Sequence, residues 1–271
     1  MAFDIKRFLV DGDKKWQWKD YPCKYSKDIP KAKEDRNKLA AELSTELDGL
    51  QDRLYGEGKR KLLVILQGMD TSGKDGTIRH VFQNVDPLGV YVEAFKAPSE
   101  AELARDYLWR VHQVVPKNGE IAIFNRSHYE DVLVTRVKEW IDADTEAKRI
   151  DHINAFETLL SDTGTEVVKI FLNISKDEQR ERLQQRIDDP NKNWKFNLGD
   201  LEDRQLWDKF QSQYARVMRK TSSKNAPWYV VPADSKSTRN IIVLQILLHH
   251  LRTMNPQYPT VDTSEWPKQI K

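Results

Sequence analysis

The sequence lacks the features that mark several classes of protein. Its 271 residues include one cysteine, Cys23, so no disulfide can form within the chain, and a reducing cytoplasmic location is expected. Its 44 lysine and arginine residues are balanced by 42 acidic residues, which argues against nucleic acid as a partner. No apolar run approaches the roughly 20 residues of a membrane span, and the first ten residues do not resemble a signal peptide. Any anion site must therefore be a local cluster in a folded domain whose residues are 39% hydrophobic.

Short apolar runs alternate with helical patterns along the chain. The apolar runs predict buried strands at 62–66, 90–95, 121–124, 167–172 and 228–231. Helical spacing of apolar residues covers 31–54, 99–115, 144–160, 176–186, 201–219 and 238–251. This alternation predicts an α/β fold with a central parallel five-stranded sheet and helices on both of its faces.

The chain shows no internal repeat and no linker rich in glycine, serine or proline. We therefore expect a single domain over residues 1–271. Residues 1–30 are expected to form an N-terminal arm, which Trp16, Trp18 and Tyr21 could pin onto the body.

A glycine-rich loop follows the first predicted strand directly. Residues 68–74 read G-M-D-T-S-G-K, and a helical pattern continues through Phe82. Glycines let backbone N–H groups turn inward around phosphate oxygens, the helix N-terminus adds partial positive charge, and Lys74 adds a full charge. The loop and the turn after it therefore predict phosphate contacts from Gly68, Met69, Thr71, Ser72, Gly73, Asp75, Gly76 and Thr77. The alternative is an ordinary strand-to-helix turn that ends in lysine.

The loop departs from the usual pattern after its lysine. Asp75 stands where a serine or threonine usually ligates Mg²⁺, and the nearest hydroxyl beyond it belongs to Thr77. Asp70 is the best candidate for the metal ligand, because Mg²⁺ prefers carboxylate oxygen, although Asp70 could also be a simple turn residue. Asp75 is expected to interact favourably with the helix dipole.

The third predicted strand ends in polar residues that should face the same crevice, because ligands in open α/β sheets bind at the carboxyl ends of strands. Asn125 stands where a P-loop enzyme usually has a metal-binding aspartate. Arg126 is expected to clamp phosphate with its planar guanidinium, unless it forms only a salt bridge to Glu130 or Asp131. Downstream, the polar, turn-rich stretch 188–203 is typical of a mobile flap and equally of a surface loop.

Several motifs together resemble the polyphosphate kinase 2 family. They read GMDTSGKDGT, IFNRSHYEDVLVTRV, ERLQQRIDDPNKNWKF, GDLEDRQLWDKF and APWYVVPAD, and the similarity runs from about Leu50 to about Pro259. The resemblance implies a P-loop kinase fold with a helical lid at about residues 186–205. It also implies Mg²⁺-dependent phosphoryl transfer between inorganic polyphosphate and a purine nucleotide. The stretch Gly73–Gly76 and Asn125 are similar to the subclass that uses both AMP and ADP.

The resemblance also implies roles for single residues. It makes Asp70 the Mg²⁺ ligand and places Lys74, Arg126 and the lid arginine Arg186 at the reacting phosphates. It puts Asn125, Glu130, Arg136 and Lys195 within reach of the bound phosphates or nucleotide. Family members are often oligomers, so a homo-oligomer is expected, with the helix at 31–54 as one possible interface.

The six histidines show no activating context, so direct in-line transfer is favoured over a phosphohistidine intermediate. Lys96 and Arg79 are candidates for a basic track that holds polyphosphate. Two other functions remain open on the same fold. One is an ATP-dependent nucleotide kinase, and the other is a nucleotide-binding P-loop protein without transfer activity.

Overall fold

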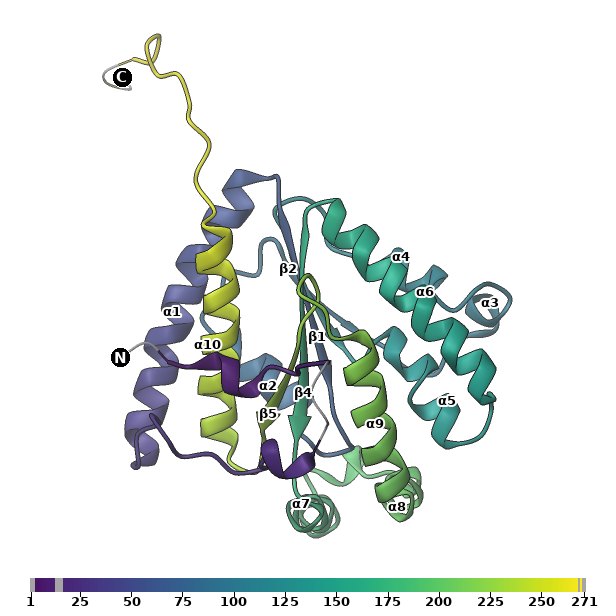
Figure 1. Cartoon of the computed structure of the whole chain (residues 1–271). Helices are drawn as coiled ribbons and strands as arrows, with labels where there is room; N and C mark the ends of the chain where they lie inside the picture. Colours follow the sequence, from purple (N-terminus) through teal and green to yellow (C-terminus); the bar gives the residue numbers. More distant parts are fainter. Residues whose placement is uncertain (1–2, 13–16, 268, 270–271) are drawn as a thin grey trace.

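The computed structural model describes residues 3–12, 17–267 and 269. Parallel strands form one five-stranded sheet in the order β2-β3-β1-β4-β5 (Figure 1). Their bounds are Lys61–Gln67 for β1, Val90–Ala94 for β2, Ile121–Asn125 for β3, Thr165–Asn173 for β4 and Trp228–Pro232 for β5. The predicted α/β fold and all five predicted strands are confirmed.

The middle of the sheet is buried on both faces because its strands carry almost only apolar side chains. Residues 62–65 in β1 and 121–124 in β3 are fully buried. The edge strand β2 is more exposed, and Val92 lies 47% exposed. In the register of the sheet, Leu66 of β1 lies beside Asn125 of β3, so both strands end at the same edge. The loops that follow them therefore meet there.

Helices cover both faces of the sheet, as predicted. Figure 1 shows α1 (Lys33–Glu57), α2 (Lys74–Val81) and α10 (Lys236–Met254) on one side. On the other side lie α6 (Ala143–Asp162) and α9 (Trp207–Thr221). The apolar stripe of α1, which includes Leu43, Leu47, Leu50 and Leu54, is buried, and α1 packs against α10. The apolar stripe of α1 therefore packs inside the chain, against α10.

Two predicted helices are each broken into two. The predicted helix at 99–115 is wrong, because the structure has α3 (Glu100–Leu103) and α4 (Trp109–His112) there. The Ser99 capping box starts α3 as expected, but the Asp106 carboxylate accepts a hydrogen bond from the Leu108 N–H (3.0 Å), and this local turn interrupts the helix.

The second break separates α8 (Leu198–Gln205) from α9. It lies within the helix predicted at 201–219, where the Leu206 N–H donates to the Asp203 carbonyl (3.1 Å) in a tighter turn than α-helical spacing. Before it lie α7 (Lys176–Asp188) and the short turn η4 (Asn193–Lys195). The predicted flap is thus largely ordered into the end of α7, η4 and the start of α8, which together make up the segment predicted as a helical lid.

The N-terminal arm contacts the sheet and α9. The Val10 N–H donates to the Trp228 carbonyl (2.8 Å), and the Ser222 hydroxyl donates to the Val10 carbonyl (2.9 Å). Trp18 packs on Phe171 of β4, with 5.9 Å between the ring centroids. Trp16 lies outside the described residues.

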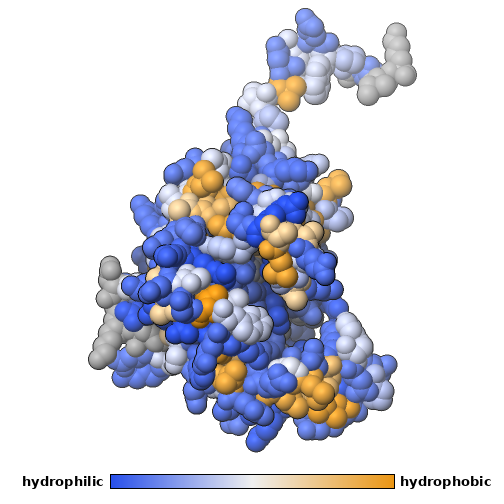
Figure 2. All heavy atoms as spheres, turned by 90° about the vertical axis from the view of Figure 1, so that its right-hand side faces the viewer, coloured by the Kyte–Doolittle hydropathy of each residue, from blue (hydrophilic) through white to orange (hydrophobic). Residues whose placement is uncertain are grey.

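The face shown in Figure 2 is largely hydrophilic, and apolar side chains gather at its lower edge, at the level of α7 and α8. Exposed apolar side chains of this part of the chain are Ile187, Trp194, Leu198 and Leu201. Across the described residues, no helix combines the length and the apolar character that crossing a bilayer requires.

Candidate active site

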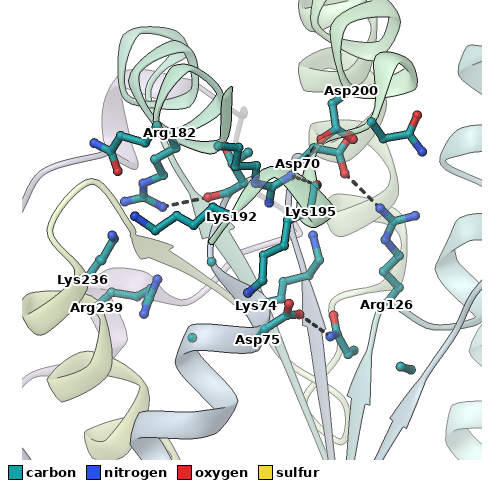
Figure 3. A pocket seen from close by; sticks show the side chains of 18 of the residues that line it. Asp70, Lys74, Asp75, Arg126, Arg182, Lys192, Lys195, Asp200, Lys236 and Arg239 are labelled. Atoms are coloured by element: carbon teal, nitrogen blue, oxygen red, sulfur yellow. Dashed lines mark hydrogen bonds and ion pairs between the residues drawn. The ribbon is translucent and has the colours of Figure 1, made fainter. Parts of the chain in front are cut away.

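A cleft of about 820 Å³ lies at the carboxyl edge of the sheet. Its walls come from the loop between β1 and α2, the ends of β2 and β3, the lid, and the start of α10. Figure 3 shows Lys74 between Arg126 on one side and Arg182, Lys236 and Arg239 on the other. The crevice that the strand ends predicted is therefore present.

The glycine-rich loop has the backbone that the phosphate-binding interpretation requires. Gly68 and Gly73 have φ of 155° and 100°, in a region that side chains with a Cβ rarely adopt. A Cβ on Gly68 would lie 2.9 Å from the Leu172 carbonyl oxygen, and a Cβ on Gly73 would collide with the Arg239 guanidinium. Only glycine fits at either position, so the close approach of backbone to a ligand is built into the loop.

Lys74 is buried in this loop. Its ammonium donates to the carbonyls of Gly68 (2.8 Å) and Met69 (3.4 Å). Burial, together with the nearby Arg126 guanidinium, lowers the pKa of Lys74 to about 8. An anion at the loop would favour the charged form further, so Lys74 is suited to hold a phosphate.

The hydroxyls of the loop differ in their contacts. The Thr77 hydroxyl donates to the Gly73 carbonyl (3.0 Å), so it is already engaged within the first turn of α2. The hydroxyl oxygens of Thr71 and Ser72 are buried and have no hydrogen-bond partner. Buried polar atoms without a partner are uncommon, and here they lie in the loop that is expected to bind phosphate.

Asp70 and Arg126 meet across the cleft. The Arg126 guanidinium donates to the Asp70 carboxylate at 2.9 Å, and Glu130 lies farther away at 3.7 Å. Arg126 has a left-handed backbone, with φ of 64°. The salt bridge to Glu130, which was the alternative for Arg126, is therefore present but longer, and Arg126 faces the loop after β1 as predicted.

Asn125 and Asp75 also meet at this edge. The Asn125 amide donates to the Asp75 carboxylate at 2.8 Å. Asp75 lies in the first turn of α2, as the helix-dipole argument expected, and it also joins the end of β3 to that helix. Both residues line the cleft.

The lid brings its own arginine to the cleft. Arg186 of α7 donates to the Asp200 carboxylate (2.9 Å) of α8 and to the Lys195 carbonyl (2.9 Å). The Lys195 ammonium lies 4.9 Å from the ring centre of Trp194. Arg186, Lys195 and Lys192 all line the cleft, so the structure brings both predicted lid residues to it.

Four basic residues of the cleft, Arg182, Lys192, Lys236 and Arg239, were missed by the sequence analysis. Arg182 and Arg239 are 6% and 2% exposed, and Lys236 lies beside them at the start of α10. The Arg182 guanidinium donates to the carbonyls of Thr71 (2.9 Å) and Ser72 (3.0 Å), so it also braces the loop. Lys236 and Arg239 could have been found from the sequence, because they follow the carboxyl end of the last strand and every strand end of a parallel sheet faces the same edge.

The cleft is strongly cationic, although the whole chain carries only +2. Nine of its lining side chains are lysine or arginine, and three are aspartate. Burial, followed by repulsion from Arg182, lowers the pKa of Arg239 to about 10. Burial, followed by repulsion from Arg182 and Arg239, lowers the pKa of Lys236. These cations repel one another, and a bound polyanion would relieve that repulsion.

Some predicted residues lie elsewhere. Arg136 contacts Glu146 (3.5 Å) and lines a separate surface cavity between α5 (Val134–Val137), α6 and α9, so the structure does not bring it to the cleft. Glu130 lines a small cavity of about 20 Å³ behind Asp70 and Arg126, together with Gly68 and Met69. Of the two candidates for a basic track, Lys96 lines the cleft, whereas Arg79 is exposed on α2 and is not among the lining residues.

The side chains fit a magnesium ion that is bound partly by substrate. In the described part of the chain, no three carboxylate, histidine or cysteine side chains converge on one point. Mg²⁺ usually binds through one or two carboxylates with substrate phosphates and water, and Asp70 can supply such a carboxylate. Burial and then the Asp70 charge raise the pKa of Asp200 to about 6, so a cation between these two carboxylates would be favoured.

Comparison with known proteins identifies the family. The model of the family described as polyphosphate kinase 2 matches residues 30–259. The chain belongs to the polyphosphate kinase 2 family. One relative, the AMP/ADP-polyphosphate phosphotransferase of Meiothermus ruber, is 50% identical over 96% of this chain and 97% of its own length. The ADP-polyphosphate phosphotransferase of Rhodopseudomonas palustris is 40% identical over 96% of this chain and 93% of its own.

A solved structure agrees with this membership. The crystal structure of polyphosphate kinase 2 from Arthrobacter aurescens is similar to this chain with a TM-score of 0.90 and 41% sequence identity. The likeness covers 94% of this chain and 91% of that chain. The resemblance drawn from the motifs and the polyphosphate kinase 2 fold are therefore both confirmed.

Proposed function

We propose that this chain transfers a phosphoryl group between inorganic polyphosphate and AMP or ADP, so that AMP becomes ADP and ADP becomes ATP. The observation that carries the proposal is the cleft, where nine cationic side chains and three aspartates surround a phosphate-binding loop. A polyanion is the ligand that such an excess of positive charge favours. The name of the Meiothermus ruber relative supports the use of both AMP and ADP.

The reaction requires two mutually repelling phosphate chains to be held in line. Lys74 and the loop N–H groups bind one chain, while Arg126 and Arg186 approach from the strand end and the lid. All three cationic side chains can offset the charge of the transferring group. Asp70 would hold Mg²⁺, which supplies further positive charge between the two substrates when it is bound.

Lid closure would complete this site. Arg186, Lys192 and Lys195 belong to α7 and to the segment that joins it to α8, so movement of the lid carries three cations together. Closure would also exclude water, which otherwise competes with the nucleotide as phosphoryl acceptor. The brace from Arg186 to Asp200 (2.9 Å) lets this part of the lid move as one unit.

Direct transfer is the proposed route. Of the six histidines, which all lie in the described part of the chain, His80 lines the cleft, and its Nδ1 lies 2.8 Å from the Gly76 carbonyl oxygen. Rapid quenching of wild-type protein and a His80→Ala variant would decide the route. Full turnover in the variant and no phosphohistidine in the wild type are expected, and a trapped phosphohistidine would contradict direct transfer.

The donor and acceptor can be tested in one experiment. Purified protein is incubated with Mg²⁺ and AMP, ADP, GMP or GDP, with either polyphosphate or ATP as donor, and the products are separated by chromatography. Products that depend on polyphosphate support the proposal. Products that form only with ATP would indicate an ATP-dependent nucleotide kinase, and binding without any product would indicate a non-catalytic protein.

We further propose that the chain is one domain, forms a homo-oligomer and resides in the cytoplasm. The single apolar core that joins the sheet to the helices supports the first proposal. The exposed edge strand β2, with Val92 and the neighbouring Leu88 both exposed, supports the second. The lone Cys23 supports the third. Limited proteolysis tests the single domain. Light scattering with a Val92→Lys variant tests the homo-oligomer, and fractionation of the native host tests the cytoplasmic location.

A further inference from the structure

A cluster of buried polar side chains lies behind Arg126, outside the cleft. It consists of Tyr129, in the short turn η3 (His128–Asp131), Glu157 of α6 and Lys169 of β4. Tyr129 and Lys169 are 0% exposed and Glu157 is 2% exposed. None of the three lines the cleft, so none can touch a substrate there.

The three side chains are joined by hydrogen bonds, and His128 Nε2 also lies 3.4 Å from Glu157 Oε1. The Tyr129 hydroxyl donates to Glu157 Oε1 (2.7 Å) and accepts from Lys169 Nζ (2.9 Å). The same ammonium donates to Glu157 Oε2 (2.5 Å) and to the Thr221 carbonyl (2.7 Å) at the end of α9. The Tyr129 hydroxyl therefore both donates and accepts a hydrogen bond, and these two bonds fix the position of the side chain.

Stability alone does not explain an ion pair at this place. Removing Lys169 and Glu157 from water is costly, and apolar side chains of similar size usually serve a core equally well or better. What the ion pair adds is geometry, because hydrogen bonds fix the direction of a neighbouring group and apolar contacts do not.

The group that this geometry can fix is Arg126. Its left-handed backbone, with φ of 64°, is uncommon for a residue with a Cβ and persists only where both flanking segments are held. On one side, the Arg126 N–H donates to the Leu66 carbonyl (3.0 Å) of β1. On the other side, the Ser127 hydroxyl oxygen accepts from the Tyr129 N–H (3.1 Å) and from the Gln67 amide (3.2 Å).

We propose that Glu157 and Lys169 are positioning residues for Arg126 and act on it through Tyr129. Anchoring of Tyr129 holds the η3 turn, which in turn holds the Arg126 backbone and aims its guanidinium at the loop. The bond from Lys169 to Thr221 also ties down α9, whose Phe210 and Tyr214 line the small cavity beside Arg126. The inference rests on the proposed function, because its readout is phosphoryl transfer.

The substitution Tyr129→Phe tests this role, since it removes only the hydroxyl. Loss of the two buried hydrogen bonds of this hydroxyl, with Glu157 and with Lys169, is expected to lower kcat about tenfold. Arg126 acts on the transferring group, so KM for polyphosphate and ADP should change by about twofold at most. Placed on an Arg126→Ala background, the same substitution should lower kcat by about twofold at most, because the side chain that it misplaces is absent.

The control is Tyr229→Phe. Tyr229 is also buried and, like Tyr129, does not line the cleft; its hydroxyl has a single side-chain partner, His250 Nε2 at 2.9 Å. Its kcat is expected to equal that of the wild type. An equal tenfold loss from Tyr129→Phe in both backgrounds, or no loss in the wild-type background, would overturn the proposal.

A second variant covers the case in which Tyr129→Phe folds poorly. The double substitution Glu157→Gln with Lys169→Met keeps the size of both side chains and removes both buried charges together. This double variant is expected to fold. Its kcat should fall as far as that of Tyr129→Phe, and the fall should again be at most about twofold on the Arg126→Ala background. Full kcat in this variant would contradict the proposal. Wild-type protein without any polyphosphate-dependent transfer would instead refute the proposed function.

Discussion

Two charged side chains of the loop, Lys74 and Asp70, are expected to contribute most to transfer. The Lys74 ammonium lies at the loop carbonyls, and Asp70 is held by Arg126. Both positions combine burial with a nearby opposite charge, which is the usual setting of a functional charged group. Two predictions about Lys74 follow from its surroundings.

Replacement of Lys74 by alanine is expected to lower kcat roughly 100- to 1,000-fold, because it removes a preorganised charge from the transferring phosphate. The fold should persist, since the side chain contacts only loop carbonyls. Steady-state kinetics and thermal unfolding measure the two effects. Lys59→Ala, at an exposed lysine before β1, is the control and should leave kcat unchanged. Near-normal turnover in Lys74→Ala would remove this lysine from the mechanism.

The pH profile should report the titration of Lys74. Burial lowers its pKa to about 8, so the free protein holds the ammonium in its charged form below that pH and loses it as the pH rises. We expect kcat/KM to fall above about pH 8, whereas kcat should fall only at higher pH because bound phosphate favours the charged form. In a Lys74→Arg variant that retains activity, the fall in kcat/KM should move to higher pH. A wild-type profile that stays flat to pH 10 would contradict this assignment.

At the scale of elements, the lid depends on a short brace between two helices. Arg186 near the end of α7 and Asp200 in α8 form an ion pair at 2.9 Å, and both side chains are largely shielded from solvent. Asn193 donates to the carbonyls of Arg186 (2.7 Å) and Ile187 (2.8 Å), which ties η4 to α7. The lid is therefore a structured unit and not a plain loop.

Arg186→Ala is expected to lower kcat about 10- to 100-fold and to raise KM for the nucleotide much less, because a lid cation acts mainly after closure. Arg180→Ala is a suitable control, since Arg180 lies on the same helix with a 66% exposed side chain near Asp177. Its kinetic constants should match those of the wild type. Weaker nucleotide binding with an unchanged kcat in Arg186→Ala would contradict the role in closure.

At the scale of the whole molecule, charge is unevenly distributed. The chain carries +2, yet the cleft alone gathers nine lysine and arginine side chains against three aspartates. The rest of the molecule must therefore be acidic on balance, which directs polyanions toward the cleft.

This asymmetry predicts a strong effect of ionic strength. Salt screens exposed charges and competes for the counterions of a polyanion, so KM for polyphosphate should rise about tenfold between roughly 50 and 300 mM salt. KM for AMP should rise much less, because AMP carries fewer charges. Kinetics at fixed Mg²⁺ measure both quantities in the same protein. Equal salt dependence for the two substrates would show that the cleft does not act through its summed charge.

Much of the architecture could be predicted from sequence because it depends on local patterns. Apolar runs mark the strands, and the loop from Gly68 to Lys74 is contiguous in the chain. The position of Arg126 in the same crevice as the loop also followed, since the ends of parallel strands share one edge, whereas its contact with Asp70 did not. The breaks in two predicted helices could not be predicted from the spacing of apolar residues. A turn at Asp106 interrupts one helix, and the short-range hydrogen bond of the Leu206 N–H interrupts the other.

Contiguous runs of residues specify the five strands, the glycine-rich loop and the family motifs of this protein, so each could be identified before the structure. Which distant cations join the loop depends on how the helices pack around the sheet. This packing brings Arg182, Lys236 and Arg239 into the cleft and turns Arg136 away toward Glu146. The direction of a long side chain depends on the packing of the helix that carries it, and packing of that kind is absent from any local pattern.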